Sequence, residues 1–141
     1  MDRNDKHQRL VEELVTVFQQ NGFEVLAADN VSGFPSPNRL SNDGYGDQEP
    51  KSPDVYAFDP ATMRYIIGEA KTGDDDLETE HSLTQYNVFL DQFDENTSRQ
   101  ARLYIILPSD KVAEFNTLIT HYIHRDYWGS IVIVQSRDVR E

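Results

Sequence analysis

Three residues with chemically active side chains stand out in the sequence because of their types and spacing. Asp54 follows Pro53, and Glu69 and Lys71 stand two positions apart at the end of an apolar stretch. Successive side chains of a β-strand point to opposite faces, so Glu69 and Lys71 should share one face while Ala70 occupies the other. Two carboxylates beside an ammonium group are suited to holding a divalent cation and to stabilising negative charge on a phosphate under attack.

The segment between the two acids predicts a β-hairpin that brings them together. Residues 55–58 read Val-Tyr-Ala-Phe, which favours a strand, and residues 59–62 read Asp-Pro-Ala-Thr, which favours a tight turn. A second strand over 64–71 would then run back beside the first. By itself, a Glu-x-Lys strand end is more often a solvated pair of charges. The predicted hairpin places Asp54 alongside Glu69 and Lys71 and makes the three residues a candidate site.

The remaining hydrophobic pattern predicts an α/β fold with a mixed central β-sheet flanked by helices. The apolar run over 102–107 ends before Pro108, as is typical of a strand buried on both faces. A third helix should be capped by Ser109 or Asp110. The expected elements, in chain order, are a helix over 5–21, strands over 23–27, 55–58 and 64–71, a helix over 79–93, a strand over 102–107, a helix after Asp110 and a strand over 131–134.

Length and composition predict one domain over residues 1–141, with a long loop at 30–52 that is rich in Gly, Pro, Ser and Asn. The mean hydropathy is -0.65. No apolar run approaches the roughly 20 residues that span a bilayer, and the first residues lack the apolar segment of a secretory signal. The absence of cysteine excludes disulfides and zinc–thiolate sites. We therefore expect a cytoplasmic protein.

The charge balance is unusual for a protein that would handle phosphates. The chain has 13 Lys and Arg against 25 Asp and Glu, a net charge of -12, and residues 72–98 contain no Lys or Arg. Proteins that bind nucleic acid usually gather cations against the phosphates. Three explanations remain open: bound metal offsets part of the field, a basic protein partner supplies the cations, or the chain does not cut anything.

Taken together, Pro53-Asp54, Glu69-Ala70-Lys71 and the order of the elements make the chain resemble the PD-(D/E)XK nuclease superfamily, whose fold is restriction-endonuclease-like. The resemblance covers about residues 5–107. It implies an α-β-β-β-α-β core, with the last helix and strand as peripheral additions. In its small size the chain is most similar to resolvase-like or restriction-associated members. By this resemblance, the chain would be an Mg²⁺-dependent endonuclease that also accepts Mn²⁺. Its substrate would be nucleic acid, mainly DNA, in a restriction, defence or recombination and repair setting.

The resemblance also implies roles for individual residues. Asp54 and Glu69 would bind the metal through their carboxylates, and Ala70 through its backbone carbonyl. Lys71 would orient the attacking water or stabilise the charge that develops on the phosphate, and we favour these roles over that of a neutral base, because nearby anions oppose loss of its proton.

Three further residues are weaker candidates for catalytic roles. Members of the superfamily often add a glutamine from the second helix, which Gln85 would match, and an acid from the first helix. There, His7 aligns with the apolar stripe and Glu13 is the acid nearest to it. Each also has an ordinary interpretation, as a helix-surface Gln, a capping or surface His and a solvated Glu.

Two other functions remain open. The chain can be a catalytically silent or partner-dependent subunit whose acidic body docks on a basic protein and acts as a protein-interaction module. It can also be an acidic decoy that mimics nucleic acid. A homodimer is a further expectation, because cutting two strands calls for two sites.

Overall fold

The computed structural model describes residues 3–40, 51–74, 76–77, 80–94 and 96–137. Within them the predicted order of helices and strands is found, with a short extra hairpin before the fourth predicted strand. The elements are α1 (Arg3–Gln20), β1 (Glu24–Ala28), β2 (Val55–Asp59), β3 (Arg64–Ala70), α2 (Glu80–Leu90), β4 (Phe93–Asp94), β5 (Arg99–Gln100), β6 (Arg102–Leu107), the 3₁₀ turn η1 (Ser109–Lys111), α3 (Val112–Tyr122), the 3₁₀ segment η2 (Arg125–Ser130) and β7 (Ile131–Gln135).

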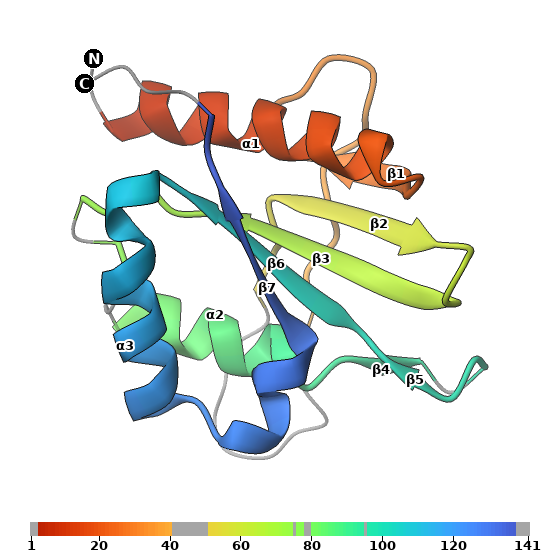
Figure 1. Cartoon of the computed structure of the whole chain (residues 1–141). Helices are drawn as coiled ribbons and strands as arrows, with labels where there is room; N and C mark the ends of the chain where they lie inside the picture. Colours follow the sequence, from red (N-terminus) through yellow and green to blue (C-terminus); the bar gives the residue numbers. More distant parts are fainter. Residues whose placement is uncertain (1–2, 41–50, 75, 78–79, 95, 138–141) are drawn as a thin grey trace.

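The main sheet has five strands in the order β1-β2-β3-β6-β7. The first three strands are antiparallel, and β3, β6 and β7 run parallel to one another. Helix α1 covers one face of the sheet, while α2 and α3 cover the other (Figure 1). The predicted α/β fold with a mixed, helix-flanked sheet is therefore confirmed.

Strand β6 lies between β3 and β7 and is buried from Leu103 to Leu107. Leu103, Ile105 and Leu107 pack into the apolar cluster shared with α2 and α3. Tyr104 and Ile106 point the other way, into the cluster formed with α1. The alternation follows from the two-residue period of a strand, and it confirms that this run is covered on both faces.

The predicted hairpin between the two acids is also found. The side chain of Asp59 accepts hydrogen bonds from the backbone N–H of Ala61 (3.0 Å) and from Thr62 Oγ1 (2.7 Å), which closes the turn between β2 and β3. The two strands pair from Asp59 and Arg64 up to Val55 and Gly68. This register places the residue before β2 beside the last residues of β3.

Gly68 lets α1 approach β3 closely. A methyl group at this position would lie 2.7 Å from Leu14 Cδ2 and 2.9 Å from Phe18 Cζ, and both of those side chains are fully buried. A larger residue would therefore push α1 away from the strand that ends in Glu69.

We expect Gly68→Ala to lower the free energy of unfolding by about 1–3 kcal/mol, because overpacking a dense core forces side chains and backbone to shift. The measurement is chemical denaturation followed by circular dichroism. The matched control is Gly129→Ala, because no described atom lies within 4 Å of the added methyl group. Equal stability of the two variants would show that α1 can move away from β3 at little cost in free energy.

Two predicted boundaries were wrong. The second helix ends at Leu90 rather than near 93, and Phe93 lies in β4 with 58% of its surface exposed. Ser109 and Asp110 do not cap α3 but form η1, and the N-cap residue of α3, Lys111, makes no side-chain capping bond. Pro108 starts this tight turn at once after β6, so the helix begins one turn later.

The last helix and strand are more than peripheral additions. Phe115, Leu118 and Ile119 of α3 are buried in the same cluster as α2 and β6. Strand β7 pairs with β6 along its whole length and extends the sheet. None of the described helices is long and apolar enough to cross a membrane.

Candidate functional site

The hairpin holds Asp54 and Glu69 in direct contact. The backbone N–H of Asp54 lies 3.0 Å from the Gly68 carbonyl oxygen and 3.1 Å from Glu69 Oε1, so it donates to both. In return, Asp54 Oδ2 accepts a hydrogen bond of 2.9 Å from the backbone N–H of Ala70. The predicted convergence of the two acids at one end of the sheet is confirmed.

Glu69 and Lys71 lie on the same face of the chain, as the strand period predicts. Lys71 Nζ is 3.4 Å from Glu69 Oε2. Ala70 points to the opposite face and packs into the cluster formed with α1. The two acids and the ammonium group therefore form one connected cluster, in which the exposed fractions of Asp54, Glu69 and Lys71 are only 8%, 2% and 5%.

Burial strongly affects the ionisation of Glu69. Loss of hydration raises the pKa of Glu69 well above its ordinary value, and the nearby negative charge of Asp54 raises it further, while Lys71 lowers it. The negative charge of Asp54 repels that of an ionised Glu69. A divalent cation between them would relieve that repulsion.

A raised pKa of a buried acid stabilises the fold below the unfolded pKa, and this stabilisation is lost as the pH rises through the folded pKa. In metal-free buffer, the melting temperature of Glu69→Gln should therefore rise relative to that of the unmodified chain as the pH is raised from 4 to 8. Thermal unfolding in EDTA at several pH values measures this difference. Glu114→Gln, on the exposed side of α3, is the control and should show no such trend. A pH-independent difference for Glu69→Gln would contradict the assignment.

Helix α2 supplies hydrogen-bond acceptors for the ammonium group of Lys71. The ammonium group donates to Gln85 Oε1 at 2.8 Å and to Ser82 Oγ at 3.1 Å. It also lies 5.6 Å from the centroid of the Tyr86 ring. A lysine ammonium has three protons to donate, and Glu69, Ser82 and Gln85 provide three acceptors. Lys71 is thus held as a fixed positive charge, and the predicted position of Gln85 at the cluster is confirmed.

Ser82 and Tyr86 are residues of the cluster that the sequence analysis missed. Ser82 Oγ donates a hydrogen bond of 2.6 Å to the Asp76 carbonyl oxygen while it accepts from Lys71. Ser82, Gln85 and Tyr86 follow the i, i+3, i+4 spacing of one helix face. That spacing was the available signal, since polar residues that share a helix face with a buried Tyr must find polar partners.

The first helix contributes His7 but not Glu13 to the cluster. His7 Nε2 lies 3.1 Å from Asp54 Oδ2, and this hydrogen bond raises the pKa of His7 despite its partial burial. The carboxylate of Glu13 is used elsewhere, because it accepts from Ser136 Oγ and from the backbone N–H of Arg137, both at 2.7 Å. Glu13 therefore ties α1 to the segment after β7.

The loop after Lys71 is closed by Asp76. Its carboxylate accepts from the backbone N–H groups of Thr72 (2.7 Å) and Gly73 (2.8 Å) and from Thr72 Oγ1 (2.9 Å). Gly73 has a φ of +84°, which favours glycine at this turn. At the outside of the loop, Lys6 Nζ forms an ion pair of 2.6 Å with Asp74.

Asp54 and Glu69 are the residues of this cluster that are suited to hold a divalent cation. Among the described residues, no group of three or more His, Asp or Glu side chains is arranged to hold a metal ion by itself. Magnesium keeps several waters and is commonly bound through only one or two carboxylates, so a two-acid site with a backbone carbonyl matches its chemistry.

Comparison of the chain with known proteins found no matching family model, no matching curated protein and no matching solved structure. The chemistry of the cluster is therefore the basis for any statement about function.

Proposed function

We propose that this chain is an Mg²⁺-dependent nuclease of the PD-(D/E)XK type with a restriction-endonuclease-like fold, which hydrolyses phosphodiester bonds in nucleic acid, mainly DNA. The observation that supports this most is the convergence of Asp54, Glu69 and Lys71 at one end of the mixed sheet. The hydrogen bonds of His7 and Gln85 to this cluster add support from α1 and α2.

Asp54 and Glu69 would hold Mg²⁺ through their carboxylates, and Ala70 through its carbonyl oxygen. When bound, the ion supplies positive charge where the phosphate gains negative charge during hydrolysis. The donors present fit it, because they are oxygen atoms and because the mutual repulsion of the two acids is relieved by a divalent charge. Mn²⁺ has the same preference for oxygen donors and should substitute.

Lys71 would position the attacking water and stabilise the developing charge rather than remove a proton. Its three acceptors suit the charged ammonium form. In the reaction, the water oxygen would form a bond to phosphorus as the bond to the leaving oxygen breaks. The proton that this water loses would pass to solvent, and the leaving oxygen would take up a proton from solvent. His7, whose side chain is 31% exposed beside Asp54, would contact a substrate phosphate.

Ser82→Ala tests whether the hydrogen bonds that α2 provides to Lys71 matter for the reaction. We expect kcat to fall about tenfold with KM little changed, because the ammonium group loses an acceptor and becomes less fixed in position. Ser82→Thr, which keeps the hydroxyl, should retain more activity than Ser82→Ala. The control is Ser109→Ala on the exposed turn η1, which should cut like the unmodified chain. Equal kcat for Ser82→Ala and the control would remove Ser82 from the mechanism.

The experiment that tests the proposed function is incubation of the purified chain with Mg²⁺ or Mn²⁺ and a panel of single-stranded, duplex and branched DNA and RNA. We expect metal-dependent cleavage of at least one substrate that EDTA abolishes. Failure to cut every member of the panel with either metal would contradict nuclease activity of the isolated chain.

A second candidate function is supported by the charge of the chain. With a net charge of -12, a partner-dependent or catalytically silent subunit that docks on a basic protein is the main alternative. It predicts that the chain co-purifies with a basic protein and that this partner is required for cutting. A homodimer, which would supply two sites for two strands, also stays a proposal.

A further inference from the structure

The four lysines of the chain gather around one end of the sheet, although the chain as a whole is acidic. They are Lys6, Lys51, Lys71 and Lys111. Lys71 belongs to the cluster itself, and Lys51 stands three positions before Asp54. Lys6 lies in the first turn of α1, and Lys111 lies in η1, which follows directly after β6. Both elements begin close to the carboxyl ends of β3 and β6 (Figure 1).

Lys6 and Lys111 both contact the loop that follows Lys71. Lys6 Nζ pairs with Asp74, and the stem of Lys111 packs so close to Gly73 that a methyl group there would lie 2.5 Å from Lys111 Cγ. The two lysines meet here because β3 and β6 are parallel, so the loops that follow them leave the sheet at the same end of the strands.

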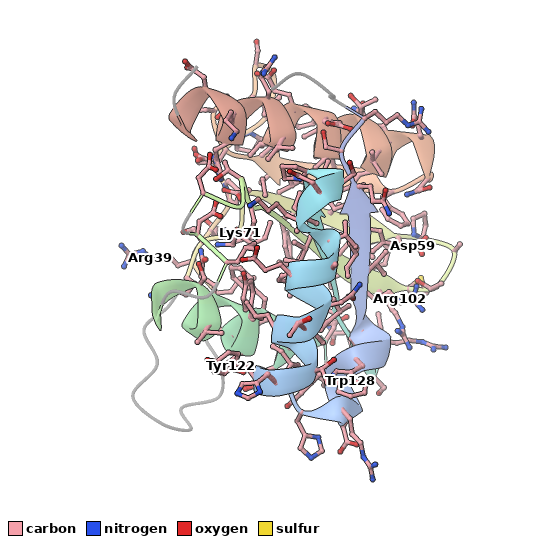
Figure 2. The ribbon with its side chains drawn as sticks, turned by 60° about the vertical axis from the view of Figure 1, so that its left-hand side comes forward. Arg39, Asp59, Lys71, Arg102, Tyr122 and Trp128 are labelled. Carbon is pink, nitrogen blue, oxygen red and sulfur yellow. The ribbon has the colours of Figure 1, made fainter. Side chains whose placement is uncertain are left out.

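Arg39 and Lys51 lie on the segment that leads to Asp54. Leu40 and Lys51 form an isolated antiparallel bridge with two backbone hydrogen bonds of 2.7 Å. Arg39 is exposed next to this bridge. Figure 2 shows Arg39 and Lys71 on one side of the molecule, with Asp59 and Arg102 on the opposite side.

Two acids of the loop after Lys71 are already engaged, whereas Asp5 and Asp110 are exposed next to Lys6 and Lys111. Asp74 is paired with Lys6, and the carboxylate of Asp76 accepts three hydrogen bonds from Thr72 and Gly73. The ion pair and the turn thus offset part of the negative charge of this loop. Arginines at the amino ends of the parallel strands are far from the site: Arg64 begins β3 and Arg102 begins β6.

We propose that Lys6, Lys51, Lys111 and Arg39 bracket the site and bind the phosphates of a nucleic-acid backbone on either side of the bond that is cut. This inference rests on the proposed nuclease function and names how its substrate is held. Lysine side chains bind phosphates as point charges. The ammonium group of Lys6 has three protons, so it can donate to a phosphate while it remains paired with Asp74.

The test measures binding without cutting. Chains that carry Lys71→Met are titrated, in EDTA, into fluorescent 20-mers of duplex DNA, single-stranded DNA and RNA, and anisotropy gives Kd between 50 and 200 mM salt. The test variant is Lys6→Gln with Lys111→Gln. The matched control is Arg99→Gln with Arg125→Gln, which removes the same charge from exposed positions at the opposite end of the parallel strands.

We expect the lysine double variant to weaken binding about tenfold or more at 100 mM salt and to lower the slope of log Kd against log salt by about 2 on the duplex, since each lost phosphate contact removes about 0.9. The arginine control should change Kd less than about twofold. Similar losses on DNA and RNA would support contacts to the backbone rather than to the bases.

Equal weakening by the two double variants, or no measurable binding of any probe by the Lys71→Met chain, would overturn the proposal. Cleavage by the unmodified chain is assayed separately. If the unmodified chain cuts but the lysine double variant binds as well as the arginine control, only the proposed phosphate contacts are rejected. If binding depends on the lysines but the unmodified chain does not cut, the nuclease function is rejected and the phosphate contacts are retained.

Discussion

Replacing Lys71 with methionine is expected to lower kcat for phosphodiester cleavage by about a hundredfold or more. The ammonium group lies 3.4 Å from Glu69 Oε2, and fixed charges of this kind supply several kcal/mol of transition-state stabilisation. Methionine keeps the unbranched stem, so packing against Tyr86 is retained. The measurement is steady-state kinetics with Mg²⁺ on whichever substrate of the panel is cut best.

The fold of Lys71→Met should survive, because the buried Glu69 can take up a proton once its positive partner is removed. Circular dichroism and thermal unfolding check this point. Since the other lysines lie around the site, the control is Arg125→Met in the exposed segment η2, which should leave kcat unchanged. A Lys71→Met chain that cuts at the normal rate would show that the reaction takes place elsewhere.

Asp54→Asn should abolish most of the affinity for divalent metal. The substitution removes one of the two carboxylates, and the charge of a carboxylate is what distinguishes a strong Mg²⁺ ligand from a weak one. The asparagine carbonyl can still accept from the Ala70 N–H, so the hairpin end keeps its geometry. We expect Mn²⁺ to raise the melting temperature of the unmodified chain, and the Kd measured by calorimetry to weaken about a hundredfold or more in the variant.

The matched control for this loss of charge is Glu12→Gln, on the exposed side of α1. It changes the net charge by the same amount and should leave the metal-induced rise in melting temperature intact. If Glu12→Gln and Asp54→Asn weaken Mn²⁺ binding equally, the ion is held by the general negative field of the chain and not by a defined site.

The arrangement of the three central residues could be predicted from the sequence because it depends on local rules. A strand period of two puts Glu69 and Lys71 on one face, and the turn residues at 59–62 fix the register that carries Asp54 to Glu69. For Gln85 the sequence left two alternatives, because a residue at the border of a helix's apolar face can reach the site or stay on the surface.

The parts that were not predicted depend on contacts between distant segments. By helical angle His7 aligned with the apolar stripe and Glu13 lay toward its flank. Their different roles are decided by where Asp54 and Ser136 arrive from other parts of the chain. Phe93 continued the helical spacing of α2, yet β4 and β5 pair as a short hairpin instead. The predicted long loop at 30–52 includes residues 41–50, which lie outside the described residues.

The charge of the chain illustrates the same limit. The net charge of -12 and the acidic stretch after Lys71 argued against phosphate binding. In the structure, the carboxylate of Asp76 accepts hydrogen bonds within the turn, and Asp74 is paired with Lys6. Lys6 and Lys111, from distant positions in the sequence, both contact the loop after β3. Total charge therefore describes the surface as a whole and not the site.

The most direct test of the central claim is a crystal of the unmodified chain soaked in Mn²⁺, with data collected at a wavelength where manganese scatters anomalously. We predict one strong anomalous peak within roughly 2.0–2.3 Å of carboxylate oxygens of both Asp54 and Glu69. An ordered site with no peak between these two acids, at manganese concentrations that saturate ordinary magnesium sites, would contradict the account.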